Sequence, residues 1–122
     1  MLAKPTNMLL QVVERQVEPN ITVVEMTGKL ALGRESQRIE TLVEDLTKKG
    51  ASRVVFDMSG VGYIDSAGVG MIALAAGRLR EAGGSLAVVA PQGGRVQQLL
   101  TLTQMSAIMT VRDNLTDALT AV

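Results

Sequence analysis

Short apolar runs alternate with amphipathic helical patterns along most of this chain, and this alternation limits the possible folds more than any other feature. Val54–Phe56 and Leu86–Ala90 are continuous apolar runs of strand length, as expected of strands that are buried on both faces. Between about Glu35 and Lys49, apolar residues instead recur at i, i+3, i+4 and i+7, which is the stripe of a helix. Such alternation implies right-handed crossovers and a largely parallel sheet.

The expected element order is ββαβαβαβα, in a single α/β domain of residues 1–122 with helices packed against a mostly parallel sheet. The first two strands should form a hairpin around the turn signal Glu18-Pro19-Asn20. The expected strands are 8–17, 21–27, 54–56, 86–90 and 108–111. The expected helices are about 35–49, about 66 to 83–84, 96–103, and a last one from an N-cap at Asp113 to residue 122. We expect residues 1–7 to be a flexible N-terminal segment and Met58 to Asp65 to be a long loop.

The chain contains neither cysteine nor histidine. Disulfides, thiolate nucleophiles, zinc sites of the Cys/His kind and Ser-His-Asp triads are therefore excluded. Carboxylate chemistry, an all-oxygen magnesium site or no catalysis at all remain.

Charge and hydropathy narrow the choice of partners. Twelve Lys and Arg balance twelve Asp and Glu, so there is no basic block of the kind that binds phosphate backbones. No apolar run approaches the roughly 20 residues that span a bilayer, and Met1 to Asn7 lacks the apolar stretch of a signal peptide. We therefore expect a cytoplasmic protein that neither binds nucleic acid directly nor inserts into a membrane.

The segment from Asp57 to Gly70 leaves a predicted strand and enters a predicted helix, which is where partners meet an open α/β sheet. Ser66 should lie at the helix start, either near the N-cap or as the first helical residue after an Asp65 cap. A capping serine contributes about 1 kcal/mol and needs no other role. A phosphate on Ser66 would instead add a charge of about −1.5 to −2 beside Asp65, at a helix N-terminus that tolerates anions. The fold should then survive while the docking of a partner is disrupted.

Glycines around Ser66 allow two interpretations. They either remove side-chain bulk so that a kinase can approach, or they only serve loop geometry; they are Gly60, Gly62, Gly68 and Gly70. Gly68 to Ala73 also matches the dinucleotide-binding pattern G-x-G-x-x-A. Ten residues separate Asp57 from the start of this match, and no ribose-binding carboxylate follows about 20 residues later. We therefore reject it and favour close packing of a slim helix.

Two further groups are expected at the same edge of the sheet. Asp57 and Asp65 are a candidate carboxylate pair for acid–base chemistry or magnesium, but no basic phosphate-binding loop accompanies them. In the loop from Pro91 to Arg95, the simpler interpretation is a turn and a helix start. Arg95 is the cation of that loop that a partner would meet.

The stretch from Arg53 to Ile72, with Tyr63-Ile64-Asp65-Ser66-Ala67-Gly68 at its centre, resembles the signature of STAS domains, the family of anti-sigma-factor antagonists. The resemblance continues through Gln97 to Met105 and Asn114 to Leu119, and it covers nearly the whole chain. It implies that Ser66 is phosphorylated by a partner that is both an anti-sigma factor and a serine kinase with the ATPase fold of histidine kinases. It further implies that a metal-dependent serine phosphatase removes the phosphate.

The resemblance implies a function by partner switching, in which the unphosphorylated chain captures the anti-sigma factor and the phosphorylated chain releases it. With this resemblance we expect a non-enzymatic protein without a cofactor or a metal. The docking surface is then expected to contain Asp57, Gly62, Tyr63, Asp65, Ser66, Ala67, Gly68 and Arg95. Many members have an acidic residue in a pattern like Gly-x-Leu-Asp where this chain has Ala31. The alternatives are a scaffold or transporter-regulating STAS domain that is never phosphorylated, and a small carboxylate or magnesium enzyme.

Overall fold

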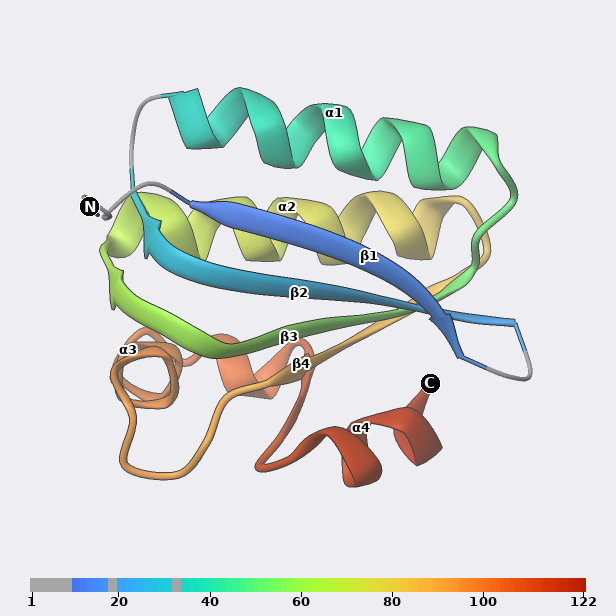
Figure 1. Cartoon of the computed structure of the whole chain (residues 1–122). Coiled ribbons are helices and arrows are strands. Elements are labelled where there is room, and N and C mark those ends of the chain that lie inside the picture. The colour runs from blue at the N-terminus through green and yellow to red at the C-terminus, as the bar shows by residue number, and fades with distance from the viewer. Residues whose placement is uncertain (1–9, 18–19, 32–33) are drawn as a thin grey trace, which may run out of the picture.

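The five strands form one sheet in the order β1-β2-β3-β4-β5. Figure 1 shows this sheet between the helices that cover its two faces. The structure, a computed structural model, describes residues 10–17, 20–31 and 34–122. β1 is antiparallel to β2, and the other neighbours are parallel. The strands are β1 (Gln11–Val17), β2 (Ile21–Leu30), β3 (Arg53–Ile64), β4 (Ser85–Val89) and β5 (Thr110–Arg112). The expected element order and α/β class are confirmed, with one added 3₁₀ turn.

Helices cover the sheet unequally. α1 and α2 lie next to each other on one face, and α4 lies on the other (Figure 1). The helices are α1 (Arg34–Lys48), α2 (Ser66–Glu81), α3 (Arg95–Leu102), the 3₁₀ turn η1 (Met105–Ala107) and α4 (Leu115–Ala121). The larger apolar core lies on the α1 and α2 side and includes Val96 and Leu100 of α3. A smaller core around Val55, Ala87 and Ala118 lies beneath α4.

The prediction of a long loop from Met58 to Asp65 is wrong, because β3 continues to Ile64 beside an equally extended β2. β3 contains one extra residue at each of two register shifts against β2. The first shift lies between the pairs Glu25–Asp57 and Thr27–Gly60, and the second lies between Gly28 and Lys29 of β2. Such bulges break the alternation of buried and exposed side chains. Met58, Val61 and Ile64 are buried at intervals of three, so this half of the strand does not follow a period of two.

Gly60 is a strand residue whose lack of a side chain is needed for close pairing. A Cβ atom at this position would lie 2.4 Å from Cγ2 of Thr27 on β2. Glycine inside a strand often marks a bulge or a close backbone approach. Gly60 therefore serves close strand pairing, and Gly62 also lies in β3 and not in a flexible loop.

Smaller corrections concern the C-terminal third. The cap of α4 is Asn114, whose side chain accepts a hydrogen bond from the backbone N–H of Asp117 at 2.9 Å. Asp113 instead accepts the backbone N–H of Gln92 at 2.5 Å and joins two loops. Ile108 lies before β5 and is exposed, so the expected strand begins two residues too early. Residues 1–9, including the expected flexible segment, and the turn residues 18–19 lie outside the described residues.

Candidate functional site

The start of α2 is built by Asp65 and not by Ser66. Asp65 has extended backbone angles, and its carboxylate accepts the backbone N–H of Gly68 at 2.9 Å. This is the N-cap arrangement, which satisfies one of the amide groups that a helix start leaves unpaired. Of the two arrangements that the sequence allows, the one with Asp65 as the cap and Ser66 as the first helical residue is correct.

Ser66 is exposed at this helix start. In the part of the chain that the structure describes, its hydroxyl makes no hydrogen bond. Because Asp65 already provides the cap, the Ser66 hydroxyl has no structural task at the helix end. An exposed hydroxyl without a partner is accessible to an enzyme that modifies it.

Gly68 connects the helix start to the sheet. A Cβ atom at this position would lie 2.5 Å from the carbonyl oxygen of Leu30 and 2.8 Å from Cγ1 of Ile64. Gly68 is itself buried, so it holds the first turn of α2 against the ends of β2 and β3. By contrast, Gly62 and Gly70 are exposed with open space around them, and Ala67 is half-buried.

Tyr63 and Lys29 form a pair beside this helix start that the sequence did not reveal. They are cross-strand neighbours in the register of β2 and β3, and Nζ of Lys29 lies 5.2 Å from the ring centroid of Tyr63. This geometry is a cation–π contact. The pairing depends on the second register shift in β3, which leaves no signal in the sequence. The two side chains add a positive charge and an aromatic ring to the surface near Ser66.

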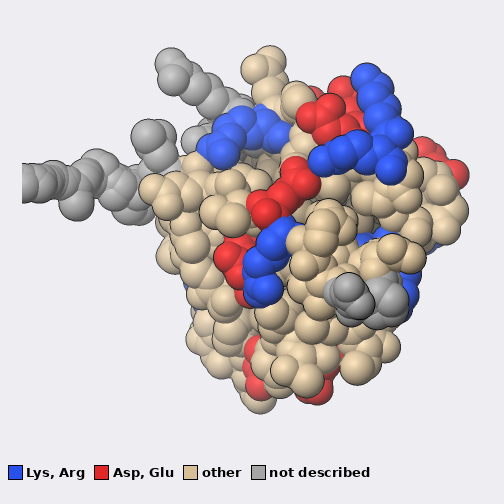
Figure 2. All heavy atoms as spheres, turned by 45° about the vertical axis from the view of Figure 1, so that its right-hand side comes forward, with Lys and Arg blue, Asp and Glu red and all other residues tan. Residues whose placement is uncertain are grey.

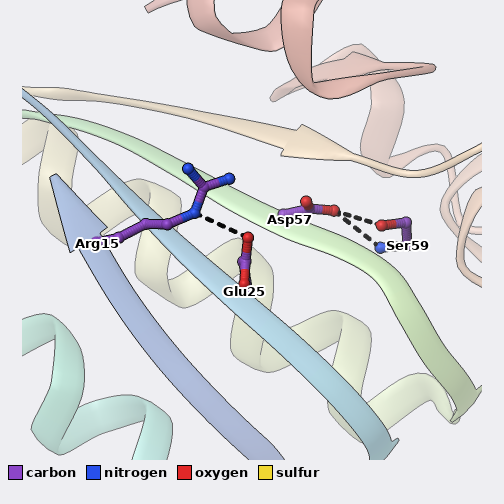
Figure 3. A network of polar contacts seen from close by, with 4 residues as sticks. All are labelled: Arg15, Glu25, Asp57 and Ser59. Atoms are coloured by element: carbon purple, nitrogen blue, oxygen red, sulfur yellow. Dashed lines mark hydrogen bonds and ion pairs between the residues drawn. The ribbon is translucent and has the colours of Figure 1, made fainter. Parts of the chain in front are cut away.

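Asp57 does not lie with the other predicted site residues. Its carboxylate accepts hydrogen bonds from the hydroxyl and the backbone N–H of Ser59, at 2.6 and 3.2 Å. Asp57 is the register partner of Glu25 on the neighbouring strand. Glu25 in turn forms an ion pair with Arg15 at 2.8 Å (Figure 3). β2 covers the stretch beside Asp57 to Ile64 in five steps, from Glu25 to Leu30, and five steps of about 3.3 Å put Asp57 roughly 17 Å from the end of β3, where Asp65 follows. The two carboxylates therefore do not form the candidate pair for acid–base chemistry or magnesium.

Ala31 and Arg95 follow β2 and β4, the strands on either side of β3. Arg95 is the exposed first residue of α3, which follows β4. Ala31 follows β2 and is only 6% exposed. A methyl group therefore occupies the buried position at which many STAS domains carry a carboxylate. β2 and β3 end side by side at Leu30 and Ile64, so Lys29 belongs to the same edge as the Asp65-Ser66 segment. β4 ends earlier, at Val89 beside Asp57, and the loop that leads to Arg95 starts there.

The charges on the face drawn in Figure 2 do not gather into one field. Figure 2 shows one face of the molecule, where Lys and Arg side chains alternate with Asp and Glu. Within residues 10–17, 20–31 and 34–122, no cluster of three or more carboxylates has the spacing to hold a metal ion. The same ranges contain no helix that is both long enough and apolar enough to cross a bilayer.

The fold and the helix start define an α/β domain with an exposed serine at the carboxyl edge of its sheet. The family model of the STAS domain matches residues 12–118, and the chain belongs to this family. A solved structure of an anti-sigma factor antagonist from Mycobacterium paratuberculosis is similar, with a TM-score of 0.81 and 21% identity over 96% of this chain and 97% of that one.

Two structures of the antagonist SpoIIAA are also similar. Its unphosphorylated form has a TM-score of 0.67 and 16% identity, covering 88% of this chain and 92% of that one. The phosphorylated form of the Bacillus protein has a TM-score of 0.63 and 16% identity, covering 84% and 91%. At these identities the likeness demonstrates a shared fold.

Proposed function

We propose that this chain is an anti-sigma-factor antagonist that acts by partner switching, with Ser66 as the phosphorylation site. The observation that carries the proposal is the exposed Ser66 hydroxyl at the first position of α2, without a hydrogen bond among the described residues. The similar structures described as anti-sigma factor antagonists support the same role. In this role the chain itself carries out no catalysis and needs no cofactor.

A phosphate on Ser66 is compatible with the folded domain. Asp65 occupies the N–H of Gly68, while the amides of Ser66 and Ala67 lie at the open end of the helix and point toward added negative charge. An anion at a helix N-terminus is stabilised by about 0.3 to 1 kcal/mol. Phosphorylation therefore changes the surface and leaves the fold in place.

The same phosphate opposes docking. It brings a charge of about −1.5 to −2 next to the half-buried Asp65 carboxylate. A partner that covers this edge must remove water from both charges, which costs several kcal/mol when no cation compensates them. The unphosphorylated surface of Gly62, Tyr63, Ser66 and Ala67 presents mainly small or uncharged groups. We infer that the unphosphorylated form binds the partner and the phosphorylated form releases it.

The partner of this switch is an anti-sigma factor that is also a serine kinase with the ATPase fold of histidine kinases. A metal-dependent serine phosphatase resets the chain. Both reactions belong to the cytoplasm, where the sigma factor and ATP are found. The docking surface in this proposal consists of Asp65, Ser66, Ala67, Gly62 and Tyr63, with Gly68 beneath it. Asp57 lies at a distance, and Arg95 is a further contact predicted from the sequence.

The test compares two exposed serines. With the cognate kinase and ATP, the intact mass should rise by one phosphate, and Ser66→Ala should abolish the increase. Ser59→Ala is the matched control, because Ser59 is also exposed but is hydrogen-bonded to Asp57; it should be phosphorylated normally. Phosphate that persists in Ser66→Ala, or is lost in Ser59→Ala, would show that the site is assigned wrongly.

Ala31 favours a second candidate function, a scaffold or transporter-regulating STAS domain that is never phosphorylated. The buried methyl group lacks the carboxylate that many STAS domains carry at this position. In such a protein, charge at Ser66 would not govern assembly. Ser66→Asp that binds its partner as tightly as the unmodified chain would favour this candidate over the switch.

A further inference from the structure

A shallow groove lies between α1 and α2 on the outer surface of the helical layer. Its floor is apolar and consists of the buried side chains of Ile39, Val43 and Ala75. Leu74 rises from its edge and is 49% exposed, although it lies in the middle of a helix that packs on the sheet. Leu74 is not part of either apolar core, and its exposed half is available for contact with another molecule.

Two opposite charges border this groove. Glu40 lines it from α1 and Arg78 lines it from α2. Both side chains are exposed, and neither forms an ion pair with any residue that the structure describes. The groove therefore offers an apolar centre with an unused negative charge on one side and an unused positive charge on the other.

The positions of these charges have two-fold complementarity. α1 and α2 each connect two parallel strands, so the two helices run in the same direction. Glu40 lies one turn before Val43, and Arg78 lies one turn after Leu74. A two-fold axis that lies in the plane of the interface, midway between Glu40 and Arg78 and at right angles to the line that joins them, exchanges these two positions. It brings Glu40 of each copy opposite Arg78 of the other. Leu74 of both copies then lies within the same interface.

We infer that the α1–α2 groove is an interface with a second copy of this chain. A two-fold interface uses the same patch on both subunits, so the patch must be complementary to itself. An unrelated partner would need both charges at a matching spacing, whereas a second copy has them already. Each subunit contributes only two exposed charged side chains and one leucine to the interface. The dimer is therefore weak, and its formation depends on protein concentration and salt. This inference does not depend on phosphorylation of Ser66.

The first test measures the oligomeric state of the purified full chain by sedimentation velocity from about 1 μM to about 1 mM at low salt. The chain should shift from monomer to dimer over this range, and Leu74→Asp should remain monomeric. Leu102→Asp is the matched control, because Leu102 is more exposed, at 77%, but lies on α3 away from the groove. It should dimerise normally. A wild-type chain that stays monomeric throughout, or equal loss of dimer in both variants, overturns the inference.

A charge exchange tests the geometry. Glu40→Arg and Arg78→Glu each place like charges opposite one another twice per dimer, and each should weaken the dimer by about tenfold or more. The double variant restores opposite charges and should return to within about threefold of the wild type. An equimolar mixture of the two single variants should form a mixed dimer. Single variants that dimerise like the wild type, or a double variant as weak as the singles, contradict the proposed axis. Circular dichroism verifies that each variant keeps its fold.

Discussion

Replacement of Asp65 separates the structural role of the helix cap from the role of Ser66. Asp65→Ala removes the acceptor of the 2.9 Å hydrogen bond from Gly68 and leaves that N–H without its partner. Loss of an N-cap side chain costs about 1 kcal/mol, within a range of about 0.5 to 2. Unfolding entropy of about 2.1 cal/mol/K per residue amounts to about 0.26 kcal/mol/K for this chain, so we expect the Tm to fall by about 4 °C.

Ser66→Ala should behave differently in the same assay. The Ser66 hydroxyl has no hydrogen bond within the described residues, so its removal should change the free energy of unfolding by less than about 0.5 kcal/mol. Asp65→Asn retains an oxygen that can accept the Gly68 N–H and should lose less stability than Asp65→Ala. Urea and thermal unfolding, followed by circular dichroism, measure all three variants. If Ser66→Ala were destabilised as much as Asp65→Ala, Ser66 would be the cap and the argument for its free hydroxyl would fail.

Three further predictions concern local packing. Gly68→Ala should destabilise the chain by about 1 to 3 kcal/mol, because its Cβ would lie 2.5 Å from the Leu30 carbonyl oxygen; chemical denaturation measures this, and an unchanged midpoint would contradict it. Gly70→Ala, at an open helical position, should instead stabilise by about 0.5 to 1 kcal/mol in the same titration. Asn114→Ala should cost about 1 kcal/mol, because it removes the cap of α4; no change in Tm would show that the cap does not hold that helix.

The regular elements were predictable from the sequence because their signals are local. Ile39, Val43 and Leu46 are spaced as one helical stripe, and all three are buried in α1. The buried strand at Val54–Phe56 and its parallel neighbour at Leu86–Ala90 likewise need only short apolar runs. The resulting order places Ser66 at the carboxyl edge before any coordinates are known.

The remaining features depend on contacts between distant residues. The second half of β3 has buried residues at intervals of three, because two register shifts against β2 interrupt its alternation. Lys29 and Tyr63 meet only through that shifted register. The separation of Asp57 from Asp65 follows from the same extended strand. None of these features can be recognised from a periodic pattern or a motif within a single segment of the sequence.

The assignment of the α2 cap to Asp65 and not to Ser66 was predictable only in part from the sequence. The sequence allowed either residue to be the cap, since both side chains can accept a backbone N–H. The choice of Asp65 depends on where β3 ends, because Ile64 is the last strand residue and the next residue starts the helix. The register of the sheet thereby leaves the Ser66 hydroxyl free.

The central claim is that phosphate on Ser66 controls binding of the anti-sigma factor, and isothermal titration calorimetry tests it most directly. The measurement uses the cognate anti-sigma factor with the unmodified chain and with the chain phosphorylated to completion. The claim predicts that phosphorylation weakens binding by about hundredfold or more, since desolvating the added charge costs several kcal/mol. Equal affinity of the two forms would contradict it.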